Sequence, residues 1–568
     1  MKKKMFILPL LAALALTGCS ADEDLRDDGN EDGKNGYGYV AVNIVQPKST
    51  GTRANENNNF EDGSEDENTA WTALFFIFNS DGNIVGNPQE ISLTGTAGTT
   101  SKSSPYVERI YNAVLVIDGA NNKPTDTYKI VCVLNAPAGL KNENILTFSG
   151  LEAKIDDYGA CEAGKFIMTN SVYKDGNTKV LGAIVDEKNI KKTADLALAN
   201  PVDVYVERVV AKIKATAGTV FANDGATVTV DGVEKNLTIN VTGIEVANIA
   251  EKSYLFKNID GITYDWTWSD PTNKRSYWET VPKVETGGTG LTFGNKSYED
   301  IVNESRPETG DFNIRNLTDF KEYVQPNTCG DQKTAILVTA ELKDDTDPFS
   351  FVYLRGGYFT PDAALALIAQ YAANNGYYKK TSADGATPEV YSQLGNDDFE
   401  WRNNNDFEEK SKIDWLKSYE VVAQVESSVI SLYKRGVDRN GEVTWTKADV
   451  NEVNNLLKGD GNNHPYVARF FTGGKCYYYV NIDQTPVAND NKPATATADY
   501  DAHKYDGVIR NHIYDLTLES IKGIGTPVFD PKDVIIPEKP ENETLWYLSA
   551  RINVLKWRIV KQNVNFGD

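Results

Sequence analysis

Residues that could perform acid–base, nucleophilic or metal chemistry are few and scattered in this 568-residue chain. The three histidines, His464, His503 and His512, have no metal-ligand spacing to one another or to a cysteine. The chain has no Gly-x-Ser-x-Gly elbow, no phosphate-binding Gly-rich loop and no dinucleotide fingerprint. His512 lies in an alternating apolar pattern, where a structural role is favoured over that of a base. The sequence therefore disfavours an enzyme, and it indicates no cofactor and no metal.

Cys19 is the residue whose position suggests a defined chemistry. Three lysines, residues 2–4, precede an apolar run over residues 5–16 that is too short to span a bilayer and is typical of a secretory signal. Residues 16–19, Leu-Thr-Gly-Cys, resemble the lipobox of bacterial lipoproteins, in which the thiol is acylated and the chain is cut before it. The resemblance implies a signal peptide over residues 1–18 and a precursor anchored in the outer membrane through Cys19. The alternative is an ordinary signal peptide with an incidental cysteine.

The other four cysteines, Cys132, Cys161, Cys329 and Cys476, lie far apart and share no framework spacing. Cys132 and Cys476 both lie within apolar runs typical of strands. Buried free thiols are therefore favoured over disulfides, although an exported protein would permit disulfides.

The composition describes an acidic, β-rich chain. It contains 81 acidic and 58 basic residues, a net charge of −23, which argues against binding to nucleic acid or to anionic lipid. Tyr and Gly are plentiful and Met is scarce, which favours strands over helices. After Leu16 no apolar run approaches bilayer length.

The N-terminal region reads as a tether, a strand and an exposed loop. Residues 20–36 are acidic and almost without apolar side chains, so they cannot fold alone. Residues 39–45 alternate, with Val40, Val42 and Ile44 on one face, and predict a half-buried strand paired within the first domain. A polar stretch over residues 46–66 follows and contains Arg53 and Ala54. An isolated arginine in such a loop is accessible to proteases, but taken alone an ordinary surface arginine is favoured.

Strands dominate the chain from residue 71 onward. Apolar or alternating runs predict strands at residues 74–78, 128–134, 202–215, 237–246, 335–342 and 350–353. Asn440-Gly441, between residues 427–437 and 442–445, predicts a hairpin turn. No repeat of 20–50 residues is present, which argues against a solenoid or a propeller.

Two helices are predicted. The first covers residues 362–375, with Thr360 as N-cap, Pro361 at the first position and Gly376 as terminator. The second runs from Thr446 to residue 457 and ends at Gly459. A change of composition after residues 206–213 predicts a border between two β domains, 54–212 and 213–540.

The C-terminal end combines a proline-studded acidic stretch, residues 527–540, with a strongly apolar pattern over residues 546–560. Even positions are apolar as far as Val554 and odd positions from Leu555, so a bulge or a break between two strands is expected there. The segment either folds back as the last strand of its own domain or completes the sheet of another molecule. The pattern alone favours folding back.

Several segments resemble Bacteroidales fimbrillins. Residues 510–514, Arg-Asn-His-Ile-Tyr, followed by 521–525, are similar to a late fimbrillin signature, and 474–481 look like the strand before it. Residues 206–211, Val-Glu-Arg-Val-Val-Ala, are similar to the segment between the two fimbrillin domains. Residues 552–559 look like the terminal donor strand of the shaft subunit of short, or minor, type V fimbriae.

The resemblance implies a mainly β fold of two tandem antiparallel, transthyretin-like β-sandwich domains with a few short helices and an extended C-terminal strand. It also implies a precursor lipoprotein whose propeptide, 19–53, is removed by an arginine-specific surface protease that cuts between Arg53 and Ala54. The strand with Val40, Val42 and Ile44 would leave, and residues 541–568 of the next subunit would fill the slot. The donor residues are Ile552, Val554, Leu555, Trp557 and Ile559.

Such a chain would polymerise head-to-tail with identical subunits into a surface fimbria that supports adhesion and biofilm formation, with separate anchor and tip subunits. Before incorporation, its last twenty residues should be extended and only lightly packed on their own chain. Two alternatives stay open. One is a surface glycan-binding lipoprotein that keeps its lipid and uses its C-terminal strand internally, and the other is an anchor or tip subunit of the same system.

Overall fold

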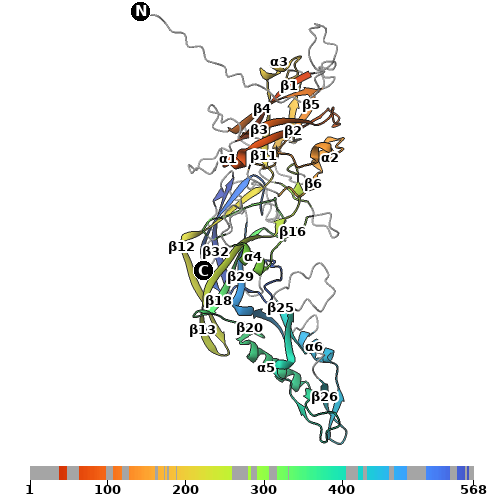
Figure 1. The fold of residues 1–568 in the computed structure, drawn as a ribbon, viewed down its shortest axis with the longest axis vertical. Coiled ribbons are helices and arrows are strands. Elements are labelled where there is room, and N and C mark those ends of the chain that lie inside the picture. Colours follow the sequence, from red (N-terminus) through yellow and green to blue (C-terminus); the bar gives the residue numbers. More distant parts are fainter. Residues whose placement is uncertain are drawn as a thin grey trace, which may run out of the picture. The chain divides into compact units, whose positions relative to one another are not determined.

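The computed structural model describes most of the chain, with gaps. The described residues are 38–47, 63–96, 107–117, 127–159, 164–171, 173–175, 178–186, 188–258, 279–282, 291–305, 316, 318–329, 332–403, 420–425, 431–459, 466–482, 507–537, 546–556 and 560–561. The chain divides into two compact units. Unit 1 contains residues 62–209 and 254–280 together with the N-terminal strand, and unit 2 contains residues 210–253 and 281–568. Each unit is built mainly from strands, as predicted (Figure 1).

Unit 1 is organised around one eight-stranded sheet. Its strands are β1 (Gly38–Pro47), β2 (Ala70–Phe78), β3 (Gln89–Thr96), β4 (Val107–Ile117), β5 (Tyr128–Leu134), β7 (Met168–Asn170), β10 (Ala183–Val185) and β11 (Val202–Arg208). The order is β3-β2-β5-β7-β11-β1-β4, with β10 also beside β5. Smaller elements are α1 (Glu65–Asn68), η2 (Leu140–Asn142), α2 (Phe148–Glu152), β6 (Ile155–Asp156), β8 (Tyr173–Asp175), β9 (Thr178–Val180) and α3 (Ala194–Leu198).

The core of unit 1 lies on β2 and β5. Residues 73–78 of β2 and 130–134 of β5 are all buried, so both faces of these strands are covered. Strands buried on both faces read as continuous apolar runs rather than as alternating ones. This is why residues 74–78 and 128–134 were recognisable in the sequence, and β5 has the predicted limits.

Unit 2 begins with two long strands, β12 (Ala211–Val230) and β13 (Val233–Ala247), which form a hairpin (Figure 1). Asp231 and Gly232, with φ of 51° and 80°, make its two-residue turn, as the left-handed positions of a type I′ turn require. Beyond the hairpin, β12 pairs with β17 (Phe320–Val324) and, in parallel, with β30 (His512–Gly523). On the other strand, β13 pairs with β18 (Ala335–Asp344), which in turn pairs with β29 (Lys475–Asn481). Side chains of both sets form one core, which includes Ile213, Leu516, Ile336, Val338 and Tyr478.

The remaining elements of unit 2 extend this sandwich. They are β14 (Ile249–Ala250), β16 (Phe293–Gly294), α4 (Tyr298–Glu304), β19 (Asp347–Pro348), β20 (Phe351–Leu354), β21 (Gly357–Phe359), α5 (Pro361–Asn374), β22 (Tyr377–Lys380), β23 (Tyr391–Ser392), η3 (Asn396–Asp398), β24 (Phe399–Asn403), β25 (Glu420–Val425), β26 (Leu432–Val437), β27 (Val443–Lys447), α6 (Val450–Lys458), β28 (Val467–Phe471), η6 (Thr472–Gly474), β31 (Thr526–Pro527), β32 (Trp546–Lys556) and β33 (Val560–Lys561). β15 (Ser253–Tyr254) lies at the division between the units. A second core packs α5 and α6 against β20, β25 and β28.

The predicted helix after Thr360 is confirmed. The Thr360 hydroxyl caps α5 by accepting from the Ala363 amide, Pro361 is its first residue, and Gly376 follows with φ of 90°. The predicted start of the other helix at Thr446 is wrong, because Thr446 pairs with Lys434 in β27. α6 instead starts after Asp449, whose side chain caps it in a capping box with Glu452.

The predicted mainly β fold is confirmed, but the sheets are mixed rather than wholly antiparallel. β1 runs parallel to β11, and β12 runs parallel to β30. Both pairs join strands far apart in the sequence, so no local turn signal could reveal them. The hairpin at Asn440-Gly441 is confirmed between β26 and β27. No helix in the described ranges is both long and apolar enough to cross a membrane.

Candidate functional site

The N-terminal strand β1 occupies a slot between two strands of unit 1. It pairs antiparallel with β4 from Gly38 to Pro47, and residues Val42 to Val45 pair in parallel with Val202 to Tyr205 of β11. The predicted pairing of this strand within the first domain is therefore confirmed. Because β1 has partners on both edges, its departure would leave an open slot rather than a shortened sheet.

The slot is apolar on its inner face. Val40, Val42 and Ile44 have 0%, 1% and 0% of their surface exposed. Burial of such a side chain stabilises by ~1.5–3 kcal/mol, so these three alone contribute on the order of 5 kcal/mol or more. The period-two pattern in the sequence thus identified the face that β1 presents to the core.

Polar contacts define the register of β1. The Asn43 side-chain amide donates to Asp203 Oδ1 at 2.9 Å. At the start of the strand, Tyr39 and Lys191 exchange two backbone hydrogen bonds of 2.8 and 2.9 Å. These contacts favour one alignment, since a slip by one residue would turn the apolar face outward.

The segment 206–211 places two buried charges in unit 1. Lys257 Nζ lies 2.8 and 2.9 Å from the two carboxylate oxygens of Glu207, and both side chains are almost fully buried. The Arg208 guanidinium, 1% exposed, donates to the Glu67 carbonyl at 3.0 Å and to Asn68 Oδ1 in α1. This motif therefore has a structural function, which is to join the end of β11 to α1.

The segment 510–514 closes a loop against the start of β30. The Tyr514 hydroxyl accepts from the Ile509 amide at 2.8 Å and donates to the Gly507 carbonyl at 3.2 Å. Asn511 has φ of 56°, and its amide donates to the Val210 carbonyl at 2.8 Å. His512 Nδ1 lies 2.7 Å from the Arg510 carbonyl oxygen, and the ring is buried. These contacts assign His512 a structural role, as the sequence favoured.

The C-terminal strand β32 pairs with β30 of its own chain. The register runs from Gly523–Trp546 to His512–Lys556, and β33 pairs with β32 on the other side. In the described part of the tail the backbone is extended, as predicted, but it pairs with β30 along the whole of β32, which is more contact than the light packing we expected. β12 pairs with one edge of β30. Folding back is possible because the opposite edge would otherwise have no strand beside it.

The register corrects one detail of the C-terminal pattern. No shift occurs between Val554 and Leu555, and the irregularity lies between Leu518 and Ser520 of β30. A break between two strands does follow, since β32 ends at Lys556 and β33 begins at Val560. Of the predicted donor residues, Ile552, Val554 and Leu555 belong to β32.

Several predicted residues lie outside the described residues. These are Cys19, Arg53, Ala54, Trp557, Ile559, Cys161, His464 and His503. Among the described cysteines, Cys132, Cys329 and Cys476 are free, and Cys132 and Cys476 are buried as predicted.

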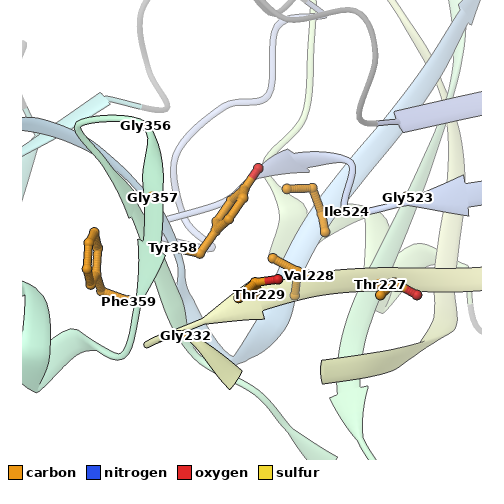
Figure 2. A pocket seen from close by; sticks show the side chains of 10 residues that line it. All are labelled: Thr227, Val228, Thr229, Gly232, Gly356, Gly357, Tyr358, Phe359, Gly523 and Ile524. Carbon is orange, nitrogen blue, oxygen red and sulfur yellow. The ribbon is translucent and has the colours of Figure 1, made fainter. Parts of the chain in front are cut away.

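A cavity of about 420 Å³ lies in unit 2 where β12 leaves β30 (Figure 2). Its walls are Thr227–Thr229 of β12, the turns at Gly232 and Gly356, β21 with Tyr358 and Phe359, and Gly523 with Ile524 after β30. The polar side chains of this lining are hydroxyls, and none is a carboxylate, histidine, lysine or cysteine. The lining thus offers neither a general base nor a metal ligand set.

Comparison with known proteins shows that part of the chain is similar to a known family. Residues 469–563 match the family model described as "Major fimbrial subunit protein type IV, Fimbrillin, C-terminal". The C-terminal region is fimbrillin-like. The matched residues contain β29, β30 and β32 and the 510–514 segment, so the resemblance to fimbrillins is confirmed for the C-terminal segments, whereas residues 206–211 lie outside the match. No curated protein sequence matches the chain.

Three solved structures are similar to the chain at low identity. A proposed cell adhesion protein from Parabacteroides distasonis has 14% identity and a TM-score of 0.37, and the match covers 92% of this chain and 98% of that one. The tip fimbrial protein Mfa3 from Porphyromonas gingivalis has 11% identity and a TM-score of 0.30, with 92% and 100% covered. A fimbrial assembly protein from Parabacteroides distasonis has 11% identity and a TM-score of 0.26, with 72% and 99% covered.

Neither edge of the slot was predicted from the sequence. The sequences of β11 and β4 do not indicate that either strand pairs with β1, because strand pairing depends on tertiary contacts between distant segments. The contacts of Arg208 with α1 were not predicted either, because the sequence singled out residues 206–211 without indicating which residues they contact.

Proposed function

We propose that the chain is a structural subunit of a surface fimbria that polymerises by donor-strand exchange after cleavage between Arg53 and Ala54. The observation that carries the proposal is the position of β1 between β4 and β11. A cut after Arg53 would separate β1 from the rest of the chain, because β1 precedes the cut and both of its partners follow it. Noncovalent contacts alone would then hold β1 in the slot.

The C-terminal strand has the properties of a replacement for β1. β32 has 11 residues and β1 has 10. Both strands alternate, and the even positions of β32 supply Trp546, Leu548, Ala550, Ile552 and Val554. A strand that alternates in this way can present one apolar face to the slot and satisfy backbone partners on both edges.

The slot also offers more than the position that β32 holds in its own chain. In its own chain β32 pairs with β30 on one edge and with only two residues of β33 on the other, whereas a strand in the slot would pair with β4 on one edge and with four residues of β11 on the other. Each added backbone hydrogen bond contributes ~1 kcal/mol net, so transfer to a neighbour's slot is favourable once β1 has gone. Donation from one subunit to the next is heterologous and does not close on itself, which produces a filament.

The proposal extends to the life of the precursor. Acylated Cys19 would hold the uncleaved chain in the outer membrane, and the cut at Arg53 by an arginine-specific surface protease would release it into the fimbria. The partners are then identical subunits, together with anchor and tip subunits. Adhesion and biofilm formation follow from the surface filament.

One observation favours a second candidate, a surface glycan-binding lipoprotein or an anchor or tip subunit. The pairing of β32 with β30 is what a chain that keeps its C-terminal strand would have. N-terminal sequencing of material sheared from the cell surface separates the candidates. A filament subunit should begin at Ala54, whereas a retained lipoprotein should be blocked at Cys19.

Deletion of residues 546–568 tests the donor strand directly. The wild-type chain should give heat-resistant ladders on denaturing gels, and the deleted chain should run as a monomer. Ladders that persist after the deletion would exclude β32 as the donor.

A further inference from the structure

Departure of β1 raises a problem for its neighbour β4. In the described sheet, β4 is the end strand and its backbone partner is β1. Without other contacts, loss of β1 would release β4, and the slot would lose one of its walls. The structure contains two polar links that hold β4 independently of β1.

The first link joins β4 to β11 through α1. The Tyr111 hydroxyl of β4 donates to the Asn68 carbonyl, and Arg208 at the end of β11 donates to Asn68 Oδ1 and to the Glu67 carbonyl. Tyr111, Asn68 and Arg208 are 4%, 0% and 1% exposed. Buried hydrogen bonds of this kind are costly to break, because each group would be left without water.

The α1 turn is itself fixed by local contacts. Ser64 and Glu67 form a capping box, and the Asn68 side-chain amide donates to the Gly63 carbonyl at 2.8 Å. Asn68 therefore keeps its carbonyl and its side chain in place without help from β1. The link thus connects the two walls of the slot near the C-terminal end of β1, where Ile44 pairs with Tyr111.

The second link lies at the opposite end of β4. Gln89 Nε2 donates to the Val116 carbonyl at 2.7 Å, and the Val116 amide donates to Gln89 Oε1 at 3.0 Å. Val116 pairs with Tyr39, near the start of β1, but both of its backbone groups bond to Gln89. The Gln89 amide thus acts as a one-residue strand partner on the far edge of β4, and it comes from β3 at the other end of the sheet order.

We propose that the Tyr111–Asn68–Arg208 link and the Gln89–Val116 link are positioning contacts that keep β4 in place when β1 leaves, so that the acceptor slot stays open. The inference rests on the proposed strand exchange. It gives a function to the buried Arg208 of the 206–211 motif, which joins the two walls across the slot.

The test compares the wild-type chain with Tyr111→Phe, Gln89→Met and the double variant. Each substitution removes the linking group and keeps the size of the side chain. Thr147→Ala, which removes the N-cap hydrogen bond of α2 away from β4, is the matched control. The full chain is cleaved at Arg53 with an arginine-specific protease, the fragment that carries β1 is separated in mild urea, and hydrogen exchange is measured over residues 107–117.

In the uncleaved chain the variants should match the wild type, because β1 holds β4 along its whole length. After β1 is removed, the wild type should keep protection in β4. In the double variant the protection factors of β4 should be about tenfold lower than in the wild type. Each single variant should show a smaller decrease, and Thr147→Ala should show no decrease. Equal protection in the double variant and the wild type, or a wild-type β4 that exchanges freely without β1, would overturn the proposal.

A second measurement separates this proposal from the exchange mechanism. A labelled synthetic peptide of residues 546–561 is added to each cleaved protein. If the double variant captures it at least about tenfold more weakly than the wild type, the links serve strand acceptance. A wild type that keeps β4 protected but captures no peptide would leave the links standing and exclude the exchange.

Discussion

At the scale of single residues, unit 1 depends on charges that are buried and paired. Glu207 and Arg208 are neighbours at the end of β11, and each finds its partner inside the protein. A buried charge without a partner is far more costly than an unpaired surface charge. The Val-Glu-Arg sequence is therefore better understood as a pair of internal links than as a surface motif.

Removal of the ammonium of Lys257 tests this point. Lys257→Met leaves the Glu207 carboxylate buried beside an apolar side chain, and we expect a loss of about 3–5 kcal/mol in the free energy of unfolding of unit 1. Urea titration followed by tryptophan fluorescence measures it. The control Lys188→Met breaks the ion pair with Asp186, where the side chains are 80% and 39% exposed, and should have little effect because solvent screens exposed charges. Equal effects of the two variants would contradict the buried pair.

The buried thiols give a second residue-scale prediction. Burial raises the pKa of Cys476 to about 12 and raises the pKa of Cys132 well above its ordinary value. The reactive thiolate is therefore almost absent from both at pH 8. Of the three described cysteines, alkylation of the native protein followed by peptide mass spectrometry should label the half-buried Cys329 first, and Cys132 and Cys476 only after unfolding. Rapid labelling of Cys476 in the native state would show that its strand opens.

At the scale of elements, unit 2 contains a small four-stranded sheet of order β23-β22-β26-β27. One face packs on the α5–α6 core through Tyr377 and Leu432. On the opposite face, Tyr391 of one edge strand stacks on Trp445 of the other edge strand, with ring centroids 4.0 Å apart. Strands in a flat sheet are about 4.8 Å apart, so these two rings must meet above the middle strands. The aromatic cluster therefore acts as a second, local core.

Truncation of Trp445 should loosen this sheet without unfolding the rest of unit 2. Trp445→Ala removes the stack with Tyr391 and the edge contact with Tyr378, and we expect a local loss of about 2 kcal/mol. Hydrogen exchange should accelerate in β22, β26 and β27 while β12 and β30 keep their protection. The exposed neighbour Thr444, changed to Ala, is the control. Unchanged exchange in β26 would mean that the cluster contributes nothing to the sheet.

Local signals predicted local elements well. β5 and the cap of α5 follow from apolar runs and from Thr360-Pro361, because these depend on residues close in the sequence. α6 was misplaced, since Thr446 and Asp449 are both good caps and only the pairing of β27 decides between them. The parallel pairs and the Gln89–Val116 contact could not be predicted, because they join segments that no turn connects.

At the scale of the whole chain, the two strands of the proposed exchange have different surroundings. β1 has partners on both edges, and its apolar face is fully buried. β32 lies on one edge of β30, with the two-residue β33 beyond it. In the proposed exchange, β32 gives up its place along β30, whereas β1 is freed from its two partners by a cut. Under the proposed exchange, this asymmetry would keep the uncleaved chain from accepting a neighbour's strand.

A disulfide between β1 and β4 would test whether β1 must leave. Asn43 of β1 pairs with Asn112 of β4, and four residues further along β4 Val116 pairs with Tyr39. The amide and carbonyl of Val116 bond to Gln89 and so point away from β1, which makes Tyr39 and Val116 a non-hydrogen-bonded pair. Along an antiparallel pair of strands, hydrogen-bonded and non-hydrogen-bonded residue pairs alternate. Asn43 and Asn112 are an even number of residues away, so they form the same non-hydrogen-bonded kind of pair, with Cα atoms ~4.5 Å apart and within disulfide reach. In the double variant Asn43→Cys/Asn112→Cys, we expect oxidised protein to be cut at Arg53 but to form no ladder.

Reduction should restore the ladder in that double variant, because the bond is the only obstacle to the exit of β1. The single variant Asn43→Cys should polymerise with or without a reducing agent. If the oxidised double variant forms ladders as readily as the reduced one, then β1 stays in its slot during assembly. The C-terminal strand would in that case join subunits elsewhere, and the edge of β30 that β32 occupies would be the next surface to examine by the same cross-linking approach.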